Sequence, residues 1–197
     1  MSEFWIYSEI GFWHVLDIKG YDHILFLIAL SAPYAFKDWR RVLILVSVFT
    51  LGHTLALMLS VFEIVTIKTS LVEFLIPITI LVTGLYNIFT AGKSAKGGNI
   101  NLIAFITLFF GVVHGLGFSN YFKTILSGSS SGKILPLLEF ALGIEFAQFV
   151  IVFLILVLSY IFQNALRFSK RDFTLVFSAF VIGVVVPMII QNEIWLK

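Results

Sequence analysis

The stretch Gly20-Tyr21-Asp22-His23-Ile24-Leu25-Phe26-Leu27 places a carboxylate and an imidazole side by side at the start of an almost purely apolar segment that continues to Leu30. Ionisable groups at the mouth of a hydrophobic segment are costly to bury, so they indicate a functional site. Three other ionisable residues within apolar segments, His53, His114 and Glu145, are best explained together with this pair.

The composition is that of a membrane protein. Of the 197 residues, 59% are hydrophobic and only 12% are charged, about half of the charged fraction of an ordinary soluble domain. So few charged side chains cannot cover a soluble core, and the sequence predicts one integral membrane domain over residues 1–197. The chain has no cysteine, which excludes disulfides and thiolate metal sites. A net charge of +2 is too small to indicate binding of nucleic acid. For a membrane protein, the expected partners are membrane lipids and further copies of the chain.

Hydrophobic segments separated by short polar ones predict an all-α, polytopic fold. Lipid offers no partner for open backbone groups, so every span must be a helix, and each approaches the about 20 residues needed to cross the hydrocarbon core. Residues 3–17 mix apolar and polar side chains with two tryptophans, which predicts an N-terminal helix lying in the membrane interface. The six transmembrane spans are predicted at residues 21–36, 39–62, 70–91, 102–122, 134–163 and 173–191.

The distribution of lysine and arginine orients these spans. Eight basic residues fall on one side of the predicted topology and five on the other. Because basic residues favour the cytoplasmic side, both termini are predicted to be extracytoplasmic. The larger group is Lys37, Arg40, Arg41, Lys93, Lys96, Arg167, Lys170 and Arg171, and the smaller group is Lys19, Lys68, Lys123, Lys133 and Lys197.

Helix rise places several ionisable residues at a similar depth, in the outer half of the membrane. His53 lies about 21 Å along the second span and His114 about 18 Å along the fourth, while Asp22 and His23 open the first span from the outer side. Three imidazoles without cysteine suit a borderline divalent metal such as nickel, cobalt or zinc. The predicted ligands are His23, His53, His114, Asp22 and Glu145, and the predicted supporting residues are Glu73, Glu139 and Gln148.

Asp22 and His23 cannot easily face the same ion, because adjacent helical residues point about 100° apart. Asp22 is therefore predicted to orient an imidazole or to bind a ligated water. His14 is interpreted as a surface residue of the interfacial helix. Small residues allow helices to approach closely around the site. They are Gly52, Gly111, Gly115, Gly117 and Gly143.

Four motifs of the chain resemble those of the HupE/UreJ family. They are Gly20-x-Asp22-His23-x-x-Phe26, Phe49-Thr50-x-x-His53-Thr54-x-x-Leu57, His114-Gly115-x-Gly117-Phe118 and Gly143-x-Glu145-x-x-Gln148. The resemblance covers the first five spans. It implies movement of nickel or cobalt across a bacterial inner membrane, by a protein usually encoded beside hydrogenase or urease genes. The chain is similar to a divergent branch, since Phe12-Trp13-His14-Val15 lacks the His-Pro element of the best-known branch.

The residues leave two functions open. A metal permease or uptake component, which the resemblance implies, would bind the cation at the outward-facing imidazoles and carboxylates and release it inward. A metal-dependent hydrolase or transferase of the zinc type would act on a lipid or membrane-embedded substrate at the outer leaflet. Glu145 or Asp22 would be its general base. The one-sided cluster favours the enzyme, because few polar groups are predicted in the inner half of the membrane.

Overall fold

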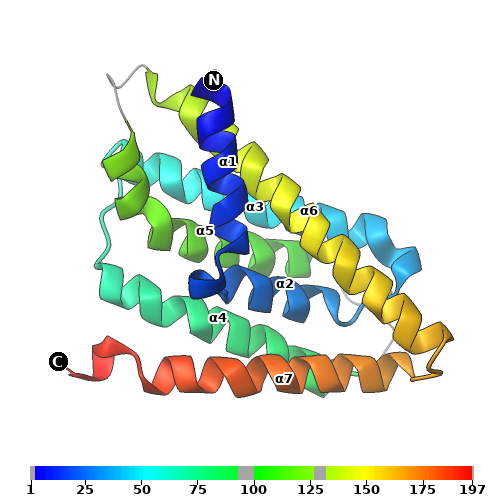
Figure 1. Ribbon diagram of the computed structural model, residues 1–197. Helices are drawn as coiled ribbons and strands as arrows, with labels where there is room; N and C mark the ends of the chain where they lie inside the picture. The colour runs from blue at the N-terminus through cyan, green and yellow to red at the C-terminus, as the bar shows by residue number, and fades with distance from the viewer. Residues whose placement is uncertain (1–2, 93–99, 127–131, 197) are drawn as a thin grey trace.

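In the computed structural model, which describes residues 3–92, 100–126 and 132–196, the chain forms seven α-helices and no strand (Figure 1). The helices are α1 (Glu3–Leu16), α2 (Asp22–Ser31), α3 (Trp39–Val61), α4 (Thr69–Thr90), α5 (Ile100–Ile125), α6 (Ile134–Asn164) and α7 (Lys170–Ile190). Short 3-10 turns occur at Ile18–Gly20, Phe36–Asp38 and Glu193–Leu196. Three of the basic residues that orient the spans, Lys93, Lys96 and Lys197, lie outside the described residues.

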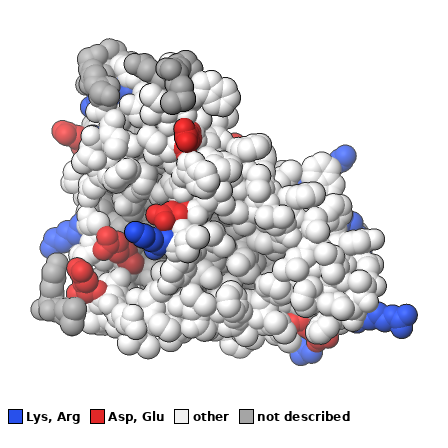
Figure 2. Space-filling model, viewed as in Figure 1, with Lys and Arg blue, Asp and Glu red and all other residues white. Residues whose placement is uncertain are grey.

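Five of these helices, α3 to α7, are long and apolar enough to cross a membrane. Each coincides with a predicted span to within three residues at either end. Large apolar side chains face outward from them, among them Phe89, which is 75% exposed, and Phe105, which is 68% exposed. On the visible face, charged side chains gather toward the two ends of the molecule and leave its broad middle uncharged (Figure 2). These features are those of an integral membrane protein.

The first predicted span, residues 21–36, is not a full crossing. Its helix, α2, has ten residues, or about 15 Å of rise, whereas the hydrocarbon core is about 30 Å thick. Seven of the ten residues are buried, and α2 contacts α3, α4, α6 and α7. The described part of the chain therefore contains five candidate crossings where the sequence predicts six, and α2 is a short helix enclosed by the long ones.

Side chains from the long helices satisfy the backbone at the end of α2. The last turn of a helix leaves carbonyls without an intrahelical partner, which is costly away from water. Pro33 has no N–H to bond the carbonyl of Ala29, four residues before it. Asn87 Nδ2 on α4 donates to that carbonyl at 2.6 Å, and Thr174 Oγ1 on α7 donates to the carbonyl of Ala32 at 3.1 Å. These bonds allow α2 to end inside the bundle.

Close backbone contacts join α3 to α5 and α1 to α6. A Cβ atom added to Gly111 would collide with the carbonyl of Phe49, and one added to Gly143 would collide with the carbonyl of Ser8. The predicted close packing at glycines is confirmed, although Gly117 meets side chains rather than backbone. Gly11 makes a similar contact with the carbonyl of Phe140, so α1 crosses closely over α6, and the location of α1 in the membrane interface stays a prediction.

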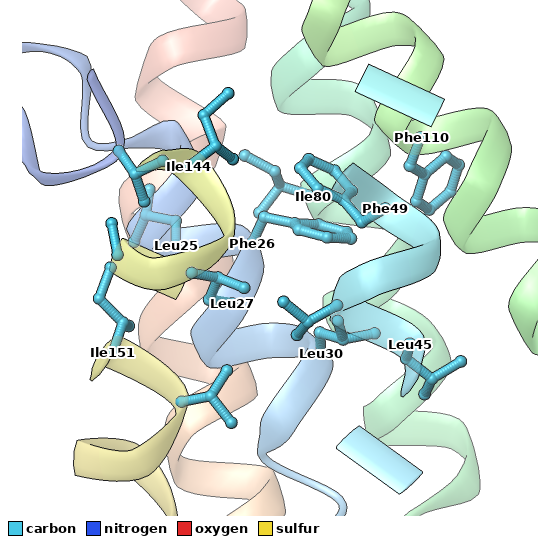
Figure 3. Close-up of a cluster of buried hydrophobic side chains, with 14 of the residues drawn as sticks. Leu25, Phe26, Leu27, Leu30, Leu45, Phe49, Ile80, Phe110, Ile144 and Ile151 are labelled. Atoms are coloured by element: carbon cyan, nitrogen blue, oxygen red, sulfur yellow. The ribbon is translucent and has the colours of Figure 1, made fainter. Parts of the chain in front are cut away.

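A layer of aromatic rings lies between α2, α3 and α5. The rings of Phe26 and Phe49 stack with their centroids 4.6 Å apart, and the ring of Phe110 lies 6.2 Å from that of Phe26 (Figure 3). Phe49 also packs against the rings of His23, at 6.1 Å, and His114, at 5.0 Å. The aromatic layer therefore forms one wall of the space that holds the buried histidines.

Candidate metal centre

A break between α1 and α2 brings two histidines together. Asp17 accepts a hydrogen bond from the backbone N–H of Lys19 at 2.9 Å, and the 3-10 turn Ile18–Gly20 redirects the chain. His14 in the last turn of α1 and His23 in the first turn of α2 consequently have ring centroids 4.7 Å apart. In a continuous helix, nine residues of rise would separate them by about 14 Å. The break therefore creates the site.

His14, His23 and His53 form a compact triad. One nitrogen of each ring can be chosen so that all three lie within 4.8 Å of one another. His53 reaches the triad from α3, with its ring centroid 5.8 Å from that of His23 and 5.9 Å from that of His14. Nε2 of His14, Nε2 of His23 and both nitrogens of His53 are buried and have no hydrogen-bond partner among the described residues. Buried polar atoms are nearly always satisfied, so these nitrogens are suited to hold a metal ion.

Asp22 orients the ring of His23. Its Oδ1 accepts a hydrogen bond from the backbone N–H of His23 at 2.9 Å and lies 3.2 Å from Nδ1 of the same residue. A proton held on Nδ1 by this carboxylate leaves Nε2 as the atom with a free lone pair. Carboxylates commonly fix metal-binding histidines in this way. Of the two roles predicted for Asp22, the geometry favours the orientation of an imidazole, that of its own neighbour.

His14 is the candidate ligand that sequence reasoning missed. Its interpretation as a surface residue is wrong, because its ring is half-buried between His53 and Phe118, whose ring centroid is 3.8 Å away. Burial and the neighbouring His23 lower the pKa of His14 to about 3, so its ring is neutral at pH 7 and can offer a lone pair. The one signal in the sequence was the polar interruption at Asp17–Gly20, which predicts a turn between the two histidines.

His114 lies beside the triad. Its Nδ1 donates to the carbonyl of Phe110 at 2.8 Å, which leaves its buried Nε2 without a partner among the described residues. Its ring centroid is 5.4 Å from that of His23. His114 is not one of the three residues whose nitrogens lie within 4.8 Å of one another. It is therefore a fourth imidazole close to the centre, outside the group of three converging nitrogens, and its predicted role as a ligand stays a prediction.

The three predicted polar residues of α6, Glu139, Glu145 and Gln148, lie where α6 contacts other helices. Glu145 Oε1 accepts a hydrogen bond from Ser47 Oγ at 2.5 Å, and Gln148 Oε1 accepts one from Thr50 Oγ1 at 2.8 Å. Both bonds join α6 to α3. Glu139 is buried, at 3% exposure, where α1 crosses α6. Within the described residues, neither Glu145 nor Glu139 belongs to the group of converging ligand atoms.

A hollow of about 360 Å³ opens where α2 and α4 begin. Asp22 and the exposed Glu73 both line it, and acidic side chains gather at this end of the molecule (Figure 2). The other lining residues are Lys19, Gly20, Tyr21, Ile76, Pro77 and Met188. Two carboxylates and one lysine leave the hollow with a net charge of −1, which favours cations over anions. Glu73 thus lines the same hollow as Asp22, the neighbour of His23, and is not itself a member of the triad.

Comparison with known proteins identifies the family. The family model described as HupE / UreJ protein matches residues 1–193, essentially the whole chain. No curated protein and no solved structure matches it. The match includes the segments that carry His14, His23, His53 and His114. The chain therefore belongs to the HupE/UreJ family, which is associated with nickel and cobalt uptake.

Proposed function

We propose that this protein binds a divalent transition-metal ion between His14, His23 and His53 and carries it across the membrane, as a nickel- or cobalt-type uptake component. The observation that carries the proposal is the convergence of three imidazoles whose buried nitrogens have no hydrogen-bond partner in the described part of the chain. Membership of the HupE/UreJ family supports nickel or cobalt as the cargo.

The ligand set suits an ion that must be released again. Neutral imidazoles bind nickel, cobalt and zinc, and affinity alone does not choose among them. Three nitrogens leave coordination positions open, whereas a purely structural zinc site is closed by four protein ligands. His114 Nε2 is also buried without a partner among the described residues, on a ring whose centroid lies 5.4 Å from that of His23. A partly open site with a spare imidazole favours exchange over permanent retention.

The broken segment formed by α1 and α2 supports transport. In many transporters, discontinuous helices form the ion site, because their ends expose polar groups within the membrane. Here the break supplies both His14 and His23, and the hollow lined by Asp22 and Glu73 lies next to it. Those two carboxylates would attract the cation, and Asp22 would hold His23 ready to bind it.

The alternative function, a zinc-type hydrolase or transferase, has weaker support. Its predicted general base, Glu145, is hydrogen-bonded to Ser47 at the contact of α3 with α6 and does not join the converging ligand atoms. The other predicted base, Asp22, is engaged with His23. These engagements weaken the case for either carboxylate as the general base.

Metal binding and flux can be measured on the same purified protein. Titration with Ni²⁺, Co²⁺ and Zn²⁺ should give one site per chain, and protein in sealed vesicles should admit Ni²⁺ or Co²⁺. His53→Ala should lose both activities, because it removes the only triad member on α3. Ser178→Ala is the matched control, since it also removes a buried polar atom without a described partner, on α7.

The possible results separate the two functions. Exchangeable nickel or cobalt together with flux supports uptake. Tightly held zinc without any flux would favour the enzyme instead. A wild-type protein that binds none of the three metals, or a His53→Ala variant with unchanged binding, would overturn the metal centre itself.

A further inference from the structure

A second, larger cavity lies at the opposite end of the bundle, among α2, α4, α5 and α7. Its volume is about 930 Å³, within the range of sites that hold small molecules. It opens beside the ends of α2 and α4 and the start of α7. None of the four histidines lines it, so it is separate from the candidate metal centre.

The rim of this cavity is positively charged. It carries Lys37, Arg41, Lys170 and Arg171 and one carboxylate, Asp38. Four positive charges against one negative charge leave a net charge of +3 on the rim. Asp38 Oδ2 lies 3.9 Å from Lys170 Nζ. A rim of this kind attracts an anion and repels a divalent cation.

The interior of the cavity is apolar in character. Phe26, Leu30, Ile103 and Phe110 form much of its wall. The polar side chains that also line it are largely engaged with backbone. Thr83 Oγ1 donates to Thr79 O, Thr90 Oγ1 to Tyr86 O, Thr107 Oγ1 to Ile103 O, Asn87 Nδ2 to Ala29 O and Thr174 Oγ1 to Ala32 O, all between 2.6 and 3.1 Å. Side chains whose hydrogens are already donated to backbone carbonyls have little capacity left to solvate an ion. The interior therefore suits hydrocarbon.

We propose that this cavity binds an anionic phospholipid, with its phosphate at the basic rim and one acyl chain inside. Basic pockets between transmembrane helices recognise anionic headgroups in this way. The acyl chain would end against Phe26 and Phe110. The ring centroid of Phe26 is 5.4 Å from that of His114, and the carbonyl of Phe110 accepts the bond from its Nδ1. The chain end would then lie one aromatic side chain away from the imidazoles.

The test is lipid retention, measured by native mass spectrometry of the purified protein. Phosphatidylglycerol and phosphatidylcholine with identical acyl chains serve as probes, and the former should be retained preferentially. Each rim charge removed by Lys37→Gln or Arg171→Gln should weaken phosphatidylglycerol binding about fivefold. Arg40→Gln is the matched control, because Arg40 is an exposed residue at the same end that does not line the cavity.

A second pair of variants tests the interior without changing charge. Ile103→Trp should fill the cavity and abolish the preference for phosphatidylglycerol, whereas Phe105→Trp, on the outer face of the same helix, should keep it. All of these variants should keep the metal content of the wild type, so that failure of the lipid site is distinguishable from failure of the metal site.

Two results would overturn the lipid site. One is equal retention of both lipids by the wild type, or a preference that survives Lys37→Gln and Arg171→Gln. The other is a water-filled cavity. The chain has no cysteine, so Ile103→Cys introduces a single thiol. In phosphatidylglycerol vesicles, a hydrophilic maleimide should label it far more slowly than the exposed Ala165→Cys. Equal rates would show that the cavity holds water.

Discussion

His14 belongs to the group of three converging imidazoles and His114 lies beside it, and this difference gives the first prediction. His14→Ala removes a member of the triad. Loss of a residue that only orients a ligand lowers metal affinity about 10–100-fold, and His14→Ala should lower Ni²⁺ affinity by more than that. His114→Ala should stay within that range, because His114 lies beside the triad. Calorimetric titration of both purified variants measures the order. The reverse order would restore the set predicted from the sequence, His23, His53 and His114.

Asp22 provides the second prediction, at the same scale. Asp22→Asn keeps the shape of the side chain but loses the charge that holds a proton on Nδ1 of His23. Metal affinity should fall about 10–100-fold, and His23→Ala should cost more. Titration of the two variants side by side measures the difference. Wild-type affinity in Asp22→Asn would mean that the carboxylate has no part in the site, and a loss equal to that of His23→Ala would make it a ligand.

The sequence predicts which residues belong near the site better than it predicts which of them converge on one point. The scarcity of charge within apolar segments singled out His23, His53 and His114, and helix rise placed them at a similar depth. His14 escaped because its neighbours, Trp13 and Val15, are typical of an interfacial helix. Only the turn after Asp17 brings His14 back onto His23, and side-chain periodicity contains no information about the direction of a turn.

Glycine contacts between helices give a prediction at the scale of the element. A Cβ on Gly111 would collide with the carbonyl of Phe49, so Gly111→Ala should force α3 and α5 apart and destabilise the protein by about 1–3 kcal/mol. Gly183 on α7 has no neighbouring atom within 4 Å of an added Cβ. Gly183→Ala should therefore be neutral or stabilise the helix by up to about 1 kcal/mol. Denaturant titration of both variants in detergent measures the free energy of unfolding, and equal effects would contradict the close packing of α3 with α5.

The five long helices could be predicted from hydropathy, because a crossing needs a fixed length of apolar sequence. The nature of residues 21–36 could not, since lipid and the interior of a bundle are both apolar solvents. The mean hydropathy of residues 21–36 is the same whether the helix faces acyl chains or other helices. What separates the two cases is the end of α2 at Ser31, where Asn87 and Thr174 bond its last carbonyls through tertiary contacts.

The orientation of the whole molecule is predicted from its basic residues, eight of thirteen of which fall on one side of the predicted topology. Because the chain has no cysteine, single cysteines report on each end. Thr66→Cys, between α3 and α4, and Ala165→Cys, after α6, both replace exposed residues. In intact cells an impermeant thiol reagent should label Thr66→Cys, and it should label Ala165→Cys only after lysis. The opposite pattern would invert the protein in the membrane.

The enclosure of α2 has a consequence for how the protein is made. A ten-residue helix is too short to be held by the bilayer alone, and its last carbonyls depend on Asn87 and Thr174. Residues 3–31 are synthesised before α7. The end of α2 therefore cannot form its bond to Thr174 until α7 has been made. A chain ending at Asn164 should insert α3 to α6 yet leave the segment around Asp17 open to added protease and the metal unbound. Protection of that segment in the truncated chain would show that α2 is already in place. Cleavage near Asp17 in the truncated chain would show that residues 3–31 reach their place only after α7 has been made.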